Sequence, residues 1–155
     1  MEDLLLFLHI LAAFWYVMGL AAVQLAYVRA VRTAELEPRV AAIEEASHYQ
    51  GVLLVPGAIA LGFSGVFYWA DRDYNLLTTG WLLALEGMYV VTLFACLPLV
   101  GVGLRRARIA ALKARRSEAA VAELERVLAE SVPLVFGGLA TVLVVGMAAV
   151  SVFRP

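Results

Sequence analysis

Four long apolar stretches constrain this chain more than any other feature of its sequence. They run over residues 4–28, 51–70, 81–104 and 132–153. A helix of about 20 apolar residues crosses the hydrocarbon core of a bilayer, and a helix satisfies all its backbone hydrogen bonds there within itself. The sequence therefore predicts an all-α fold, in which residues 1–155 form a single integral membrane domain built as a four-transmembrane-helix bundle.

Composition excludes several other classes of protein. Of the 155 residues, 63% are hydrophobic and only 16% are charged, against about 25% charged residues in a soluble domain. A soluble domain of this size leaves roughly 30% of its unfolded surface exposed, which cannot hide so much apolar area. The net charge of −1 offers no basic excess for nucleic acid. A single cysteine, Cys96, excludes a disulfide framework, and we expect it to be buried and inert.

The basic residues indicate how the chain is oriented in the membrane. The connection over residues 29–50 holds three of the 12 Lys and Arg residues, and the connection over 105–131 holds seven. Because such residues concentrate in cytoplasmic connections, we expect a multi-pass protein of the bacterial inner membrane with both termini outside. The short loop over 71–80, flanked by Trp69 and Trp81, then lies at the outer face.

Both basic connections are expected to be helical. Pro38 suits a first helical position, residues 105–116 continue the third span, and Ser117 with Glu118 predicts a new helix over 118–130. These extensions either pair into a cytoplasmic stalk or form a solvated, charged hairpin. Small residues recur in the spans and let membrane helices approach closely, which favours a compact bundle and a homo-oligomer or larger membrane complex; they are Gly62, Gly65, Gly101, Gly103, Gly137 and Gly138.

Two ionisable side chains, His9 and Glu86, fall inside the predicted spans. At a rise of 1.5 Å per residue, both lie roughly 9–10 Å from the centre of their span, toward the outer face. Ser64 and Met147 fall near the same layer. Ionisable groups at membrane depth are costly and often functional, so we expect His9 and Glu86 to approach within direct or one-water hydrogen-bonding reach.

Polar side chains of the first span share one helical face. At 100° per residue, His9, Tyr16 and Tyr27 line up with Gln24 beside them, and this stripe should face the bundle interior. His9 is either a structural histidine bonded to Glu86 or a tyrosine, or a ligand to haem iron or copper. Tyr16 is a pocket wall or a hydrogen-bond donor, and Glu86 forms a packing hydrogen bond, relays protons or supports a metal ligand.

A second candidate site lies at the inner edge of the second span. Glu45 and His48 have the Glu-x-x-His spacing of di-iron bundles, which need a second such motif and two further glutamates. The chain offers one motif, with Glu44 and Glu130 nearby, so His48 is otherwise a solvated interfacial residue. His48 and His9 are expected near opposite membrane faces and cannot ligate one iron within one subunit.

Motifs in all four spans, in a shared order, resemble those of CopD-like copper-resistance proteins and HemJ-type protoporphyrinogen oxidases. The first span has histidine, then an aromatic residue seven positions on, then glycine. The chain is most similar to the bacterial predicted integral membrane proteins of this group. The residues that carry the resemblance are His9, Tyr16 and Gly19, then Pro56, Gly62 and Gly65, then Gly80-Trp81-Leu82, and finally Glu130-Ser-Val-Pro133 with Arg154-Pro155.

The resemblance implies a small haem b protein for redox or haem and porphyrin handling, with His9 as an axial ligand. Tyr16 would then border the ring, Met147 or a water would be the opposite ligand, and Glu86 would tune the iron. A porphyrinogen oxidase of the HemJ type has lysine at position 85, where this chain has Leu85. The alternatives are a CopD-like copper-handling protein, although the chain lacks the cluster of soft ligands that Cu(I) prefers, and a non-catalytic membrane subunit or assembly factor.

The predicted orientation can be tested by labelling introduced cysteines in intact cells. A membrane-impermeant thiol reagent applied from outside should label Asn75→Cys and leave Lys113→Cys unlabelled, because the positive-inside rule places them on opposite sides. Permeabilised cells, in which both sites should react, are the control. Labelling of position 113 but not of position 75 in intact cells would show that the orientation is reversed.

Overall fold

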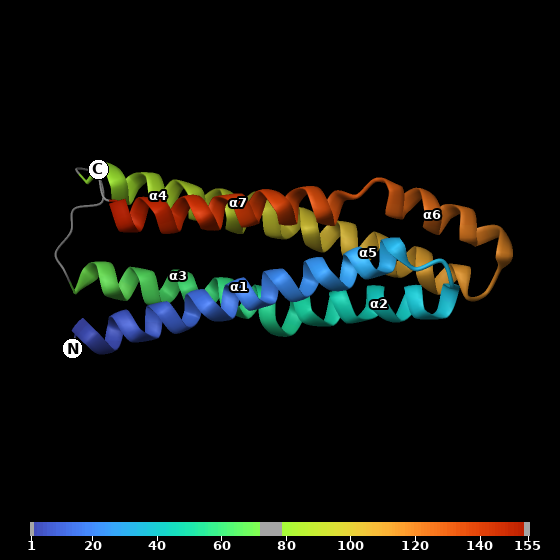
Figure 1. Cartoon of the computed structure of the whole chain (residues 1–155), viewed down its shortest axis with the longest axis horizontal. Helices are drawn as coiled ribbons and strands as arrows, with labels where there is room; N and C mark the ends of the chain where they lie inside the picture. The colour runs from blue at the N-terminus through green and yellow to red at the C-terminus, as the bar shows by residue number, and fades with distance from the viewer. Residues whose placement is uncertain (1, 72–78, 154–155) are drawn as a thin grey trace.

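The computed structural model describes residues 2–71 and 79–153, and over these residues the chain is helical, without strands (Figure 1). Most of the loop predicted over 71–80 and the terminal Arg154-Pro155 lie outside the described residues. The helical elements in chain order are α1 (Glu2–Arg32), α2 (Leu36–Tyr49), η1 (Gln50–Leu54), α3 (Val55–Ala70), α4 (Gly80–Val91), η2 (Thr92–Cys96), α5 (Leu97–Ala114), η3 (Glu118–Ala120), α6 (Val121–Ala129) and α7 (Val132–Phe153).

These elements confirm the predicted four-span bundle. Within the described residues, four helical runs are long and apolar enough to cross a membrane: Asp3–Arg32, Leu36–Ala70, Gly80–Ala114 and Glu118–Phe153. The second and third runs have 35 residues each, which is about 52 Å of helix against a hydrocarbon core of about 30 Å. Part of each run therefore projects beyond the bilayer, as expected for the helical extensions.

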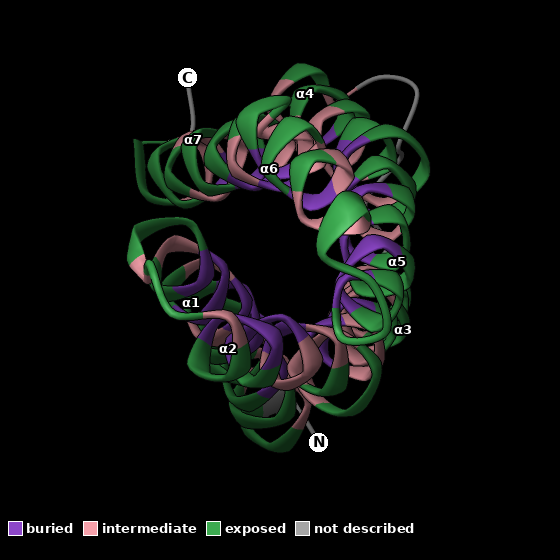
Figure 2. Cartoon of the chain, turned by 90° about the vertical axis from the view of Figure 1, so that its right-hand side faces the viewer, coloured by how far each residue is buried: buried purple, intermediate pink, exposed green. Residues whose placement is uncertain are grey.

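Two helix pairs make up the bundle. The helix α1 lies along α2, η1 and α3, whereas α4 and α5 lie along α7 (Figure 1). The start of α1 and the end of α7 are at one end of the molecule, here called the terminal half, and α2, the end of α5 and α6 are at the other, here called the extension. Buried residues face inward along the extension (Figure 2). Eight residues of α5 are buried, but only Leu82 of α4, so the core is concentrated away from the terminal half.

The extension has an apolar core of its own. Val40 and Ile43 of α2, Leu104 of α5 and Leu124 of α6 are all 0–1% exposed and belong to one cluster. Fully burying each such side chain contributes about 1.5–3 kcal/mol. The paired stalk is thus confirmed, and the solvated hairpin is not what the sequence forms.

Ion pairs link the helices of the extension. Arg115 donates to Glu37 at 2.7 Å, across 78 residues of sequence, and this hydrogen bond raises the pKa of the Arg115 guanidinium above its ordinary value. Arg39 is buried, pairs with Glu125 of α6, and donates from Nε to the Thr33 carbonyl at 2.7 Å. Arg39 therefore connects the turn between α1 and α2 to α6.

Three of the four helical runs continue from end to end, although two of them contain a π turn. The fourth run is broken. The π-helical turns η1 and η2 come just before Pro56 and Pro98, where proline removes a backbone donor and crowds the preceding turn, so the helix widens locally without ending. Between α6 and α7 the chain breaks at Ser131, which has a positive φ of 52°. Neither π turn is predicted from the sequence.

Glycines set the closest approaches between helices. A Cβ on Gly19 of α1 would lie 2.6 Å from the backbone nitrogen of Leu54, and a Cβ on Gly57 would lie 2.8 Å from the backbone of Tyr16. Of the glycines that the sequence analysis selected, Gly138 meets nothing within 4 Å, whereas the other five contact a neighbouring side chain. Small residues therefore bring α1 against η1 and α3, through two glycines that were not among those predicted to pack helices.

Replacing Gly19 by alanine should destabilise the bundle by about 1–3 kcal/mol, because the added methyl group meets rigid backbone and forces α1 away from η1. Gly87→Ala is the matched control, since a Cβ there meets nothing within 4 Å and alanine favours the helix. Thermal unfolding in detergent, followed by circular dichroism, measures both. Equal melting temperatures for the two variants would contradict the close approach.

Candidate functional site

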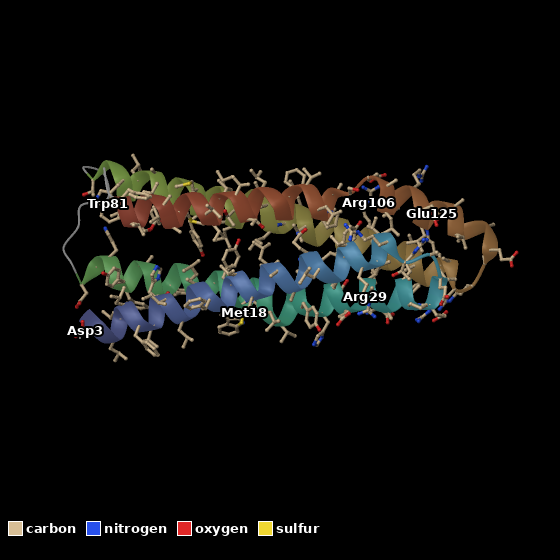
Figure 3. The ribbon with its side chains drawn as sticks, in the orientation of Figure 1. Asp3, Met18, Arg29, Trp81, Arg106 and Glu125 are labelled. Atoms are coloured by element: carbon tan, nitrogen blue, oxygen red, sulfur yellow. The ribbon has the colours of Figure 1, made fainter. Side chains whose placement is uncertain are left out.

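A cavity of about 440 Å³ lies in the terminal half, between the α1–α3 pair and the α4–α7 pair. Side chains from both pairs project into the space between them (Figure 3). Most of the lining is aliphatic, and the lining includes His9, Tyr16, Glu86 and Met147. The structure thus brings together, from three helices, the four residues that the sequence analysis selected as a site.

His9 is held by α3. Its Nδ1 atom lies 3.0 Å from Oγ of Ser64, and its ring stacks on Tyr68 with an interplanar angle of 8° and a centroid distance of 6.1 Å. Gly65 leaves room for the ring, because a Cβ there would lie 3.2 Å from Cε1 of His9. The imidazole is therefore fixed in both position and plane.

The two hydrogen bonds of Ser64 restrict the tautomer of His9. The Ser64 hydroxyl donates to the carbonyl of Leu61 at 3.0 Å, and a carbonyl can only accept. Toward His9, Ser64 then presents a lone pair, so both bonds form together only when Nδ1 carries the proton. In the neutral imidazole this leaves a lone pair on Nε2, which no described residue binds. In that tautomer Nε2 of His9 is free of hydrogen bonds to the described residues.

The expected direct pair between His9 and Glu86 is not formed. The hydrogen bond of His9 goes to Ser64 on the adjacent α3, whereas Glu86 lies on α4, in the other helix pair. Glu86 is half-buried, lines the same cavity and has no hydrogen bond or ion pair with any described residue. The position of His9 and Glu86 in the sequence predicted correctly that they lie at one depth. It could not predict which neighbouring helix each side chain would face.

Tyr16 has an unpaired hydroxyl at the cavity. The residue is 1% exposed, and its hydroxyl has no hydrogen-bond partner among the described residues. An unsatisfied buried polar group costs about 1–3 kcal/mol, and this hydroxyl is enclosed by protein atoms although the residue lines the cavity. The predicted inward face of the first span is confirmed, since Tyr27 is fully buried and Gln24 donates to the Pro133 carbonyl of α7 at 2.9 Å.

Tyr68 and Tyr89 belong to the site and were not selected from the sequence. Tyr89 lines the cavity and donates to the Ala58 carbonyl at 2.7 Å, and Tyr68 supports the His9 ring. Tyr89 follows Glu86 by three residues, and this spacing on one helix face could have indicated it. Met147 is buried in α7 with 9% exposure, so its thioether is a cavity wall.

The second candidate site is not assembled. Glu45 accepts hydrogen bonds from Arg29 at 3.2 Å and from Tyr49 at 2.8 Å, and Glu44 faces Arg115 at 3.6 Å. His48 is exposed beside the Tyr49 ring, as expected for a solvated interfacial residue. Over residues 2–71 and 79–153, no group of three or more His, Cys, Asp and Glu residues is placed to hold a metal ion.

Comparison with known proteins identifies one family. A family model described as "Predicted integral membrane protein (DUF2269)" matches residues 3–155. No curated protein and no solved structure gives a significant match to the chain. The match covers all four spans and the cavity between them.

Two tyrosine-to-phenylalanine changes should shift stability in opposite directions. Tyr16→Phe should raise the free energy of unfolding of the cofactor-free protein by about 1 kcal/mol, because it removes an unpaired buried hydroxyl. Tyr89→Phe should lower it by about 1 kcal/mol, because it removes the hydrogen bond to Ala58. Thermal unfolding in one detergent compares them, and a decrease of the melting temperature in both variants would show that the Tyr16 hydroxyl has a partner.

Proposed function

The chain belongs to the DUF2269 family of predicted integral membrane proteins, and we propose that it binds haem b in its cavity for redox or haem and porphyrin handling, with His9 as an axial ligand. The observation that carries the proposal is the hydrogen-bond chain from His9 through Ser64 to Leu61. Metal-ligating histidines typically donate their other ring N–H to such a partner, which fixes the tautomer and the ring orientation.

The volume and the lining of the cavity support the proposal of a large apolar cofactor with a metal at its centre. Its volume of about 440 Å³ falls in the range of roughly 300–1,000 Å³ of sites for organic ligands. The lining is mainly apolar, with one imidazole from α1 and one thioether, Met147, from the helix pair opposite. Histidine and methionine are together a known axial pair for haem iron. The donor set therefore supports one haem rather than a multi-ligand metal cluster.

The other polar residues have separate tasks in this proposal. Haem supplies one-electron redox chemistry when it is bound. Tyr16 lines the cavity and would border the cofactor. Glu86 places a carboxylate in the cavity, where an anionic side chain favours the more positively charged, oxidised state of a nearby metal. The protein thus binds and orients the group and sets its potential.

The histidine variants test the assignment directly. His9→Ala should abolish or strongly weaken haem retention, because no other described histidine lines the cavity, whereas His48→Ala should leave it intact. The measurement is the absorption spectrum and haem stoichiometry of the wild type and both variants, expressed with ample haem. A haem-free wild type, or full occupancy in His9→Ala, would refute the proposal. A colourless wild type that retained copper would favour copper handling, and one that retained neither would favour a subunit or assembly role.

Two conservative variants test the residues that would act on the haem without ligating it, namely Ser64 and Glu86. Ser64→Ala should weaken haem binding about 10–100-fold, the typical effect of losing the partner of a ligating histidine. Glu86→Gln should retain haem and raise its midpoint potential, because a negative charge near the iron is removed. Redox titration followed by absorption measures the second effect. An unchanged potential in Glu86→Gln, together with unchanged affinity in Ser64→Ala, would place the cofactor away from this cavity.

A further inference from the structure

A second hollow, of about 490 Å³, lies on the surface of the bundle, separate from the His9 cavity. It runs between α1 and the helix formed by α2 and η1. Met18 is near its apolar end and Arg29 is at its polar end, closer to the extension (Figure 3). These two residues are 11 positions apart, which is about 16 Å along α1. We call this hollow the α1 groove.

The apolar part of the α1 groove is open at membrane depth. Met18 is 59% and Leu25 is 71% exposed, and Ala22 between them leaves a shallow channel along α1. Leu53 of η1 forms the other wall of the channel, and Gly19, next to Met18 in the chain, brings α1 onto the backbone of η1. A groove of this shape on the bilayer-facing surface fits a hydrocarbon chain.

The other end of the α1 groove carries a pair of opposite charges. Nη1 of Arg29 lies 3.2 Å from the Glu45 carboxylate, which also accepts the Tyr49 hydroxyl at 2.8 Å. A guanidinium has five N–H donors, and among the described residues Glu45 engages Arg29 through Nη1 alone. The side chains of Arg29 and Glu45 are 61% and 36% exposed. Both charges are therefore open to a ligand that enters from the membrane surface.

We propose that the α1 groove binds a glycerophospholipid whose head group carries a primary amine. An acyl chain would lie along Met18, Ala22 and Leu25, the phosphate would accept hydrogen bonds from Arg29, and the ammonium would donate to Glu45. Guanidinium and phosphate have matching geometry for such bonds. The adjacent carboxylate disfavours a head group that is only anionic, and a trimethylammonium group has no N–H to donate. The lipid comes from the leaflet on the side of the extension.

Native mass spectrometry of the full chain tests this assignment. The protein is equilibrated with equimolar phosphatidylethanolamine, phosphatidylglycerol and phosphatidylcholine, and the lipids that remain bound are counted. The wild type should retain phosphatidylethanolamine in preference to the other two. Arg29→Gln should reduce its retention roughly tenfold, because a charge-assisted pair of hydrogen bonds is lost. Glu45→Gln should keep lipid bound but lose the preference over phosphatidylcholine.

Two more variants make the outcome decisive. Arg32→Gln is the control, since Arg32 lies one turn further along α1 and does not line the groove, and its retention should equal that of the wild type. Ala22→Phe fills the channel without touching the charged pair and should also reduce retention roughly tenfold. Equal retention of the three lipids by the wild type would overturn the proposal. So would a loss in Arg32→Gln equal to that in Arg29→Gln, or wild-type binding by Ala22→Phe.

Discussion

The packing of the extension is the interaction on which the rest of the structure depends. Ile43, Leu104 and Leu124 bring α2, α5 and α6 together in an apolar core, and the pairs Arg115–Glu37 and Arg39–Glu125 fasten its outside. Because both helix pairs are joined at this end, they need not pack tightly at the other. The bundle is thus closed by the packing of the extension, and the cavity lies in the terminal half.

One polar side chain of the site has partners on a neighbouring helix, and two others have none among the described residues. His9 has a hydrogen bond, a stacked ring and a glycine that makes room for it, all from α3. By contrast, the hydroxyl of Tyr16 and the carboxyl of Glu86 have no partner among the described residues. Unpaired polar groups are costly in an apolar setting, and a ligand in the cavity that reached the carboxyl of Glu86 would remove part of that cost.

Most of the fold could be predicted from the sequence, because bilayer thickness and the run length of apolar residues leave few choices. The site was predictable in part: depth along a helix follows from residue number, which placed His9, Glu86 and Met147 in one layer. The rotation of one helix against another depends on close contacts. Examples are the contact of Gly19 in α1 with η1 and that of Gly57 in α3 with α1, and the spacing of residues in the sequence does not reveal them. For this reason Ser64, not Glu86, is the partner of His9. The π turns before Pro56 and Pro98 were missed because a proline in an apolar span is equally compatible with a kink.

The break at Ser131 has a consequence for the wall of the cavity. The second and third runs, Leu36–Ala70 and Gly80–Ala114, pass from the extension to the cavity wall as continuous helices, each with one π turn. The fourth run is broken between α6 and α7 at Ser131, which has a positive φ. The orientation of α7, which carries Met147, is therefore set by its packing on α4 and α5 and not by the direction of α6.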